Sequence, residues 1–289
     1  MRIQHNIAAL SSHRNLTNNN SSVTKNLEKL SSGYKINRAG DDAAGLAISE
    51  KMRAQITGLE TATKNAQDGV SLVQTAEGAL TEVHSMLNRM VELATQSANG
   101  TYSSTNRQEM QKEINALRAE IDRIGKSSNF NGTSLFTGSS SITLHVGETS
   151  KAHNQLKVTL NQMSSSQIGT HTTNATTFKK TLTTGKAVSN ISVTTAAKAK
   201  EAIDIANNAI DQISSMRSDF GALQNRLEHT INNLSVQSEN ITAAESRIRD
   251  VDMAKEMMAY TKNNILVQAS QAMLAQANQV PQGVLQLLQ

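Results

Sequence analysis

A run of eleven apolar or small residues in the first half of the chain constrains the fold more than any other feature. The positions advance by alternating steps of three and four residues, which is the spacing of a heptad seam on one helix face. They are Leu59, Ala62, Ala66, Gly69, Val73, Ala76, Leu80, Val83, Leu87, Met90 and Ala94. A helix from about Ala43 to Asn99 would carry this seam and span roughly 85 Å at 1.5 Å per residue. The seam needs a partner helix, and Gly69 and Gly78 predict that the partner packs closely.

A second heptad in the C-terminal half supplies a candidate partner. Its positions recur every seven residues, and the positions three residues after each are apolar at both ends and polar in the middle. They are Ile213, Phe220, Leu227, Leu234, Ile241 and Ile248, followed by Met216, Leu223, Thr230, Gln237, Ala244 and Val251. We predict one helix from about Ala196 to Leu234 or further, and a last helix from about Asp252 to the C-terminus. Pairing the two halves of the chain leaves the middle projecting outward.

The remaining segments complete a mainly α fold of long antiparallel helices, with an N- and C-terminal coiled-coil stem and a small β-hairpin in the middle of the chain. Residues 3–30 predict a weak helix that needs a partner, and a loop is expected to follow it. A helix from about Thr105 to Ser127 is expected to fold back on the long helix. Alternating residues in 141–146 and 156–160 predict the hairpin strands. The Thr-rich residues 164–194 predict an exposed, irregular segment.

The last part of the chain, residues 263–289, carries no charged side chain. Apolar residues would lie on most sides of its helix, which indicates a buried or membrane-bound helix. Seven glutamines and Pro281 disfavour lipid, and a terminal helix of a small monomer cannot bury all its faces. Burial among other copies of the same chain is then favoured, and packing within the chain's own bundle is the simpler alternative.

Composition argues against several classes of function. The chain has no cysteine, which excludes disulfides, thiol nucleophiles and thiolate-bound metals. The net charge is only +4, and basic residues alternate with acidic ones instead of forming a nucleic-acid-binding face. None of the seven histidines has metal-ligand spacing, and no nucleotide-binding or hydrolase motif occurs. We therefore predict no enzyme activity, no cofactor or metal, and no binding of nucleic acid or membrane.

Two smaller features have structural interpretations. Asp41 and Asp42 are interpreted as a helix cap with a salt bridge to Arg38 or Arg53. Residues 1–25 lack the continuous apolar core of a signal peptide, so no cleaved signal peptide is expected.

Four long blocks of sequence carry a specific signature. The first two are EKLSSGYKINRAGDDAAGLAISEKMRAQITGL (28–59) and NAQDGVSLVQTAEGAL (65–80). The other two are ITAAESRIRDVDMAKEM (241–257) and MLAQANQVPQGVLQLL (273–288). In this order, the four blocks resemble the conserved blocks of bacterial flagellins. The resemblance covers about residues 1–136 and 196–289, and the chain looks like a short form with a reduced central region.

The resemblance implies a structural subunit that polymerises into the extracellular flagellar filament for swimming motility. It implies an inner terminal coiled-coil domain (1–42 and 246–289), a helical rod domain with the hairpin (43–163 and 195–245) and a short variable exposed insert (164–194). Implied partners are other copies of the chain, an export chaperone on the C-terminal helix, and the hook-associated junction and cap proteins. Filament-core contacts are assigned to Ile3, Ile7, Leu10, Ile265, Leu266, Met273, Leu274, Val284, Leu285 and Leu288.

A host receptor is also implied by the resemblance. Flagellins of one class are recognised by the animal innate receptor Toll-like receptor 5, and LNRMVELATQSANG (87–100) resembles the motif that contacts it. The matching positions are Arg89, Leu93 and Glu113. Arg89 and Leu93 are i, i+4 neighbours on one helix, and Glu113 lies on the return helix, so the three are expected to form one patch. A filament would cover this face, so receptor binding should require the free monomer.

Two alternatives stay open at the level of sequence. A flagellin-like hook–filament junction protein would share the fold, although such proteins usually diverge in the C-terminal block, which is intact here. A secreted coiled-coil adhesin or effector would lack the paired terminal blocks.

Overall fold

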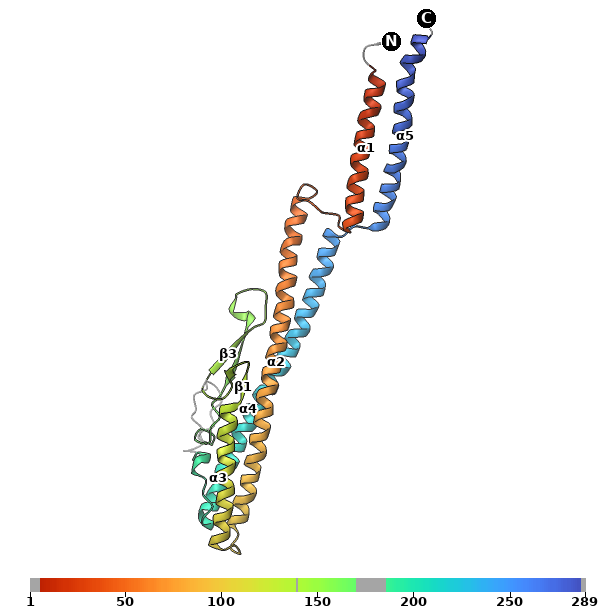
Figure 1. Cartoon of the computed structure of the whole chain (residues 1–289). Coiled ribbons are helices and arrows are strands. Elements are labelled where there is room, and N and C mark those ends of the chain that lie inside the picture. The colour runs from red at the N-terminus through yellow and green to blue at the C-terminus, as the bar shows by residue number, and fades with distance from the viewer. Residues whose placement is uncertain (1–5, 139, 170–185, 287–289) are drawn as a thin grey trace. The chain divides into compact units, whose positions relative to one another are not determined.

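The computed structural model describes residues 6–138, 140–169 and 186–286, and these residues are mainly helical (Figure 1). The helices are α1 (Ile7–Ser32), α2 (Ala43–Ala98), α3 (Ser104–Ser127), α4 (Ala196–Arg249) and α5 (Met253–Gln286), with single 3₁₀ turns η1 (Ala152–Asn154) and η2 (Val188–Asn190). The strands form two antiparallel pairs, β1 (Asn129–Phe130) with β2 (Thr133–Ser134) and β3 (Ser140–His145) with β4 (Gln155–Leu160). The predicted mainly α fold with long helices and a small β-hairpin is confirmed.

The chain forms two compact units. The first consists of Met1–Thr57 and Ser238–Gln289, and the second of Gly58–Gln237. The first unit therefore holds α1, α5 and the adjoining ends of α2 and α4. The second holds the longer parts of α2 and α4 together with α3 and the strands.

Polar side chains and a glycine fix the ends of the helices in the first unit. The Asn6 side chain accepts a hydrogen bond from the backbone N–H of Ala9, at 3.1 Å, and so caps the start of α1. α1 ends at Gly33, whose φ of 75° is left-handed and whose N–H donates to the Lys29 carbonyl. Asp42 and Asp252 cap α2 and α5 in the same way as Asn6, by accepting the backbone N–H groups of the residues three positions later. The boundaries of these helices thus follow from local sequence.

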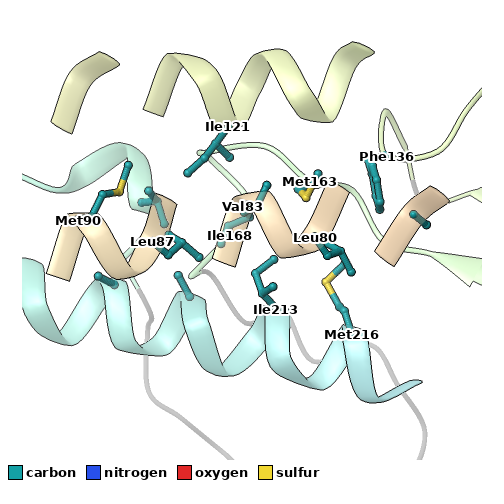
Figure 2. Packing of buried hydrophobic residues seen from close by; sticks show 14 of the residues in the cluster. Leu80, Val83, Leu87, Met90, Ile121, Phe136, Met163, Ile168, Ile213 and Met216 are labelled. Atoms are coloured by element: carbon teal, nitrogen blue, oxygen red, sulfur yellow. The ribbon is translucent and has the colours of Figure 1, made fainter. Parts of the chain in front are cut away.

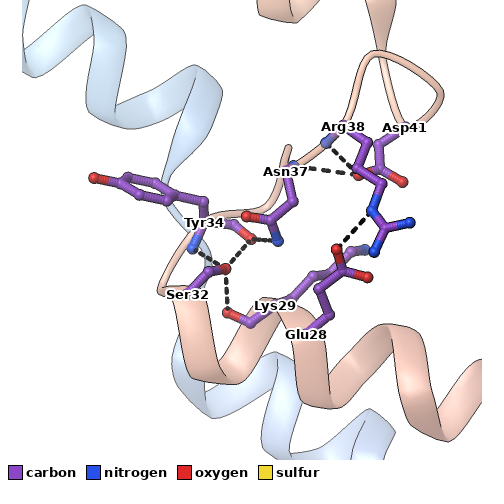
Figure 3. Close-up of polar contacts among 7 residues, drawn as sticks. All are labelled: Glu28, Lys29, Ser32, Tyr34, Asn37, Arg38 and Asp41. Atoms are coloured by element: carbon purple, nitrogen blue, oxygen red, sulfur yellow. Dashed lines mark hydrogen bonds and ion pairs between the residues drawn. The ribbon is translucent and has the colours of Figure 1, made fainter.

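The loop between α1 and α2 is held by Asp41 (Figure 3). Its carboxylate accepts the backbone N–H groups of Arg38 and Asn37 at 3.1 and 3.2 Å, and these bonds hold the pKa of Asp41 below its ordinary value. The predicted salt bridge from the Asp41–Asp42 pair to Arg38 or Arg53 is wrong. Arg38 pairs with Glu28 at 2.9 Å and Arg53 pairs with Glu245 at 3.4 Å, because these glutamates lie on the helices that face the arginines.

Backbone pairing joins the end of α1 to the start of α5. The Lys35 N–H donates to the Arg249 carbonyl at 2.7 Å, and the Val251 N–H donates to the Gly33 carbonyl at 3.0 Å. The Arg249 guanidinium also lies over the Tyr34 ring, 5.0 Å from its centre. These contacts place α1 and α5 side by side although they are far apart in sequence (Figure 1).

The core of the second unit is formed by the predicted heptads (Figure 2). All eleven residues of the first seam are buried, and Ile213, Phe220 and Leu227 of the second seam are buried against them. α3 contributes Ile114 and Ile121 to the same cluster, which agrees with its predicted return along α2. The buried side chains are mostly aliphatic, so long helices form this core with few aromatic residues.

The β3–β4 hairpin packs on the seam through its alternating side chains. Ile142 pairs with Val158 and Leu144 with Leu156 across the ladder. A Cβ on Gly69 would overlap the Leu144 side chain, which explains the glycine in this position. The predicted close packing of a partner helix at Gly78 is wrong. If Gly78 carried a Cβ, no described atom outside its own helix would lie within 4 Å of it.

The segment 164–194 is only partly as predicted. Ile168, Val188, Ile191 and Val193 are buried, so an exposed insert is the wrong description of its two flanks, 164–169 and 186–194. The flanks pair with each other, because the Val188 N–H donates to the Ile168 carbonyl at 3.0 Å and apolar side chains of both enter the core. Residues 170–185, the rest of this prediction, lie outside the described residues.

Candidate assembly surface

The α1–α5 pair is antiparallel and is held by polar contacts. The Asn6 amide donates to the Ala277 carbonyl at 2.7 Å, and the Asn19 amide donates to the Ser270 hydroxyl at 3.0 Å. In the amide orientation that satisfies its partners, Asn26 bonds to Glu256 and Asn263, each at 3.0 Å. Asparagines spaced along α1 therefore bridge to α5, where a monomeric helix pair would place leucines.

The face of each helix that looks toward the other holds few large apolar residues. Leu16, Val23 and Leu30 of α1 and Val267 and Leu274 of α5 are half-buried, interspersed with asparagine, serine and alanine. No described residue of α1 is fully buried. Because burial of apolar area is the main favourable term in helix association, this contact alone is weak.

Large apolar residues instead point away from the partner helix and into solvent. Leu10 is 71% exposed, Ile265 is 60% exposed and Met273 is 63% exposed. Further exposed apolar residues of the two helices are Ile7, Leu27, Met253, Met257, Met258 and Leu266. We call the exposed apolar residues of both helices the outer face of the α1–α5 pair. Apolar surface on this scale marks a site of contact with another protein.

The residues predicted to make filament-core contacts fall into three groups. Ile7, Leu10, Ile265, Leu266 and Met273 lie on the outer face, whereas Leu274 is half-buried between the helices. The side chains of Val284 and Leu285, and the residues Ile3 and Leu288, lie outside what the structure describes.

Sequence reasoning missed four members of the outer face. Leu27, Met253, Met257 and Met258 belong to it, but none of them was predicted to be a contact residue. Helical spacing from Ile265 was a usable signal for Met258, which lies seven residues earlier on the same side of α5.

A second surface joins α2 to α3 around Arg89. The Arg89 guanidinium contacts Glu113 and Glu92, each at 2.9 Å, and all three side chains are largely exposed. The hydrogen bond to Glu113 and then that to Glu92 raise the pKa of Arg89 above its ordinary value. The structure thus brings together two of the three residues of the predicted receptor patch.

Leu93, the third residue, does not lie on this surface. It is 2% exposed and belongs to the core cluster beside Met90 and Ala94. Leu93 is buried together with the neighbouring seam residues, whereas the Arg89 side chain is exposed, so an i, i+4 relation on one helix does not make both residues accessible. In the described chain Arg89 and Glu113 are accessible, and Leu93 is not.

The described residues contain no cluster of three or more histidines, cysteines or acidic residues suited to a metal ion. In the same part of the chain, none of the helices has the length and apolar content needed to cross a bilayer.

The chain matches two regions of one family of known proteins. Residues 3–141 match the bacterial flagellin N-terminal helical region, and residues 203–288 match the bacterial flagellin C-terminal helical region. Neither match includes residues 142–202, which contain the central segment 164–194 with its buried flanks.

Similar proteins align over the full length. A flagellin of Bacillus subtilis is 52% identical, and a flagellin of Halalkalibacterium halodurans is 51% identical, with 100% of both chains covered in each case. Among solved structures, a Vibrio parahaemolyticus protein described as a flagellar hook-associated protein has a TM-score of 0.59 at 13% identity, covering 73% of this chain and 100% of that chain. At such low identity the last similarity concerns the fold alone.

Proposed function

This chain belongs to the bacterial flagellin family, and from that premise we propose that the outer face of the α1–α5 pair is the surface through which its copies assemble. The chain is a structural subunit that polymerises into the flagellar filament, the organelle of swimming motility. The open question is which surfaces of the chain contact neighbouring copies in the filament.

One observation supports the outer face. The α1–α5 pair keeps asparagine and serine between its helices and turns Leu10, Ile265 and Met273 outward. At roughly 25 cal/mol per Å² of apolar area removed from water, covering this face with neighbouring copies stabilises both the polymer and the helix pair itself. The same surface in an isolated chain is costly, because water remains in contact with it.

The arrangement of domains in the filament is part of the proposal. Residues 1–42 and 246–289 form the inner domain, in which the outer faces of many copies meet. Residues 43–163 and 195–245 form a surrounding rod domain with the hairpin. The family resemblance and the polar character of the α1–α5 contact support this order.

Seeded elongation tests the assigned surface. Ile265→Asp places a charge on the outer face and is expected to slow elongation of filament seeds at least about tenfold, because a buried unpaired charge costs several kcal/mol. Ile265→Leu, the matched control, keeps the apolar surface and should elongate seeds at close to the wild-type rate. Ile265 is largely exposed in the single chain, so circular dichroism of the two monomers should agree. Equal elongation by Ile265→Asp and Ile265→Leu would show that the filament does not use this face.

The same assay separates the subunit from a junction protein. A filament subunit extends seeds into long fibres, whereas a junction protein adds to a few terminal positions and stops. The full-length similarity to flagellins supports long fibres.

Further partners follow from the outer face being exposed before assembly. We propose that an export chaperone covers the C-terminal helix in the cell, and that the hook-associated junction and cap proteins contact the chain at the two ends of the filament. We also propose that the chain is exported through the flagellar channel without cleavage of its N-terminus. Mass spectrometry of the intact filament protein tests this part. A mass lower than that of the full sequence by the mass of a leader peptide would refute uncleaved export.

Recognition by Toll-like receptor 5 is a second proposed property of the monomer. The exposed contact of Arg89 with Glu113 supports it, because this contact presents opposite charges on two neighbouring helices, α2 and α3. Leu93 then supports the patch from below and does not act as a contact residue in the described conformation.

A pull-down with the receptor ectodomain tests this property. Arg89→Ala should reduce capture of the monomer and leave its melting temperature close to wild type, because the side chain is exposed. Arg123→Ala is the matched control, since Arg123 forms an exposed ion pair with Glu120 elsewhere on α3, at 2.8 Å. Capture that is equal for Arg89→Ala, Arg123→Ala and wild type would contradict recognition through Arg89.

A further inference from the structure

Methionine is distributed unevenly over the surface of the chain. Among the described residues, every exposed methionine lies on α5: Met253, Met257, Met258 and Met273. The methionines elsewhere are buried, as Met90, Met110, Met163 and Met216, or half-buried, as Met52 and Met86. The accessible thioether groups of the described chain are therefore concentrated on one helix.

Two of these methionines, Met258 and Met273, form an apolar stripe with Ile265. Met258, Ile265 and Met273 recur at intervals of seven and eight residues, which places them on the same side of a helix. Met258 is 68% exposed, and no described side chain shields it from water. Met253 and Met257 lie nearer the start of α5, and the helical repeat places them on other sides of the helix than Met258.

A methionine surface has two chemical properties that an isoleucine or leucine surface lacks. Its flexible, polarisable side chains adapt to partners of different shape. Its sulfur atoms also react with peroxides, and the resulting sulfoxide is polar and no longer fits an apolar contact.

We propose that the four exposed methionines of α5 are an oxidation site that controls assembly, and that sulfoxide formation there prevents a subunit from joining the filament. The inference rests on the proposed assembly through the outer face. The reactant is a hydroperoxide such as hydrogen peroxide. Its O–O bond breaks and an S–O bond forms, so the thioether sulfur loses two electrons and the peroxide is reduced to water.

The effect follows from where the new oxygen would lie. In the free monomer the sulfoxide points into solvent, so the fold tolerates it. In the polymer it would lie in apolar surroundings, where a polar group without full hydrogen bonding is unfavourable. Oxidation therefore acts on assembly and leaves the core of the second unit, with its buried methionines, unchanged.

Competition between oxidised and unoxidised monomers tests the proposal in the wild-type chain. Monomer is treated with hydrogen peroxide until about half of the exposed methionines are oxidised, mixed with seeds, and separated into filament and soluble fractions. Peptide mapping by mass spectrometry then gives the sulfoxide content at each methionine. We expect sulfoxide at the four α5 positions to be depleted about tenfold in the filament fraction. Met52 and Met86, which lie outside α5, serve as internal controls and should be equally oxidised in both fractions.

Equal sulfoxide content of the α5 methionines in the two fractions would overturn the proposal, and so would equal depletion at Met52 and Met86. Replacement of the four α5 methionines by leucine should give a monomer whose elongation resists peroxide, while Met52→Leu with Met86→Leu should remain sensitive. Peroxide-sensitive elongation in the fourfold variant would also refute it. Untreated wild-type monomer that fails to elongate seeds would instead contradict the proposed function.

Discussion

At the scale of single residues, glycines separate places where the chain is tightly packed from places where it is open. Gly125 of α3 lies against the backbone carbonyl of Met163, so a Cβ there would overlap the carbonyl oxygen. Gly78 of α2 meets no described atom outside its own helix within 4 Å. The same substitution should therefore have opposite effects at the two positions.

Gly125→Ala should destabilise the monomer by about 1–3 kcal/mol, because the backbone of residue 163 must shift to admit the methyl group. Gly78→Ala should stabilise it by up to about 1 kcal/mol through helix propensity. Urea unfolding followed by circular dichroism measures both changes. A Gly125→Ala variant as stable as Gly78→Ala would show that α3 does not pack on residue 163 as described.

Single residues also show the limits of sequence reasoning. The caps Asn6, Asp42 and Asp252 can be predicted because they act within one turn of a helix. The burial of Leu93 is harder to predict, because it belongs to a core cluster that also includes residues of α3 and the segment around Val193. The exposed or buried state of such residues depends on contacts across long separations in sequence.

At the scale of elements, two polar side chains hold the flanks of the central segment. The Asp122 carboxylate accepts the backbone N–H and the hydroxyl of Ser165 at 2.7 and 2.8 Å, and the Gln212 side chain accepts the Gly169 N–H at 2.9 Å. Ser165 is nearly buried, so these bonds replace bonds to water that it lacks.

Asp122→Ala should cost about 1–3 kcal/mol of stability, because it leaves two donors of Ser165 without an acceptor. It should also speed proteolytic cleavage between residues 164 and 190. Glu120→Ala is the control, since Glu120 lies on the same helix and pairs with the exposed Arg123. If the Asp122→Ala and Glu120→Ala variants resist protease equally well, Asp122 does not anchor the flanks of the central segment.

Elements with strong periodicity were predictable, and elements fixed by individual polar anchors were not. The seam of α2 and the alternation in β3 and β4 predicted those elements to within a few residues, and the seam of α4 predicted its start but left open its extension beyond Leu234 to Arg249. The buried flanks of 164–194 escaped because their polar composition resembles a solvated loop. The anchors Gln111, Asp122 and Gln212 that hold them come from distant helices, and no local pattern indicates such pairs.

At the scale of the whole molecule, the central claim is that the chain is complete only in a polymer. The apolar character of residues 263–289 predicted burial among copies, and the exposed Ile265 and Met273 in the single chain agree with a surface that awaits a neighbour. The family resemblance also predicted filament-core contacts at Ile7 and Leu10 of α1, and both side chains are exposed in the single chain. What sequence alone did not reveal is the polar contact between α1 and α5.

A cryo-electron microscopy map of the filament tests this claim most directly. The account predicts that Leu10 of α1 and Ile265 of α5, both exposed in the single chain, are buried against neighbouring copies, while Asn19 and Ser270 remain bonded within each chain. A filament in which Leu10 and Ile265 stay in contact with solvent, and in which subunits meet only through α2, α3 and α4, would contradict it.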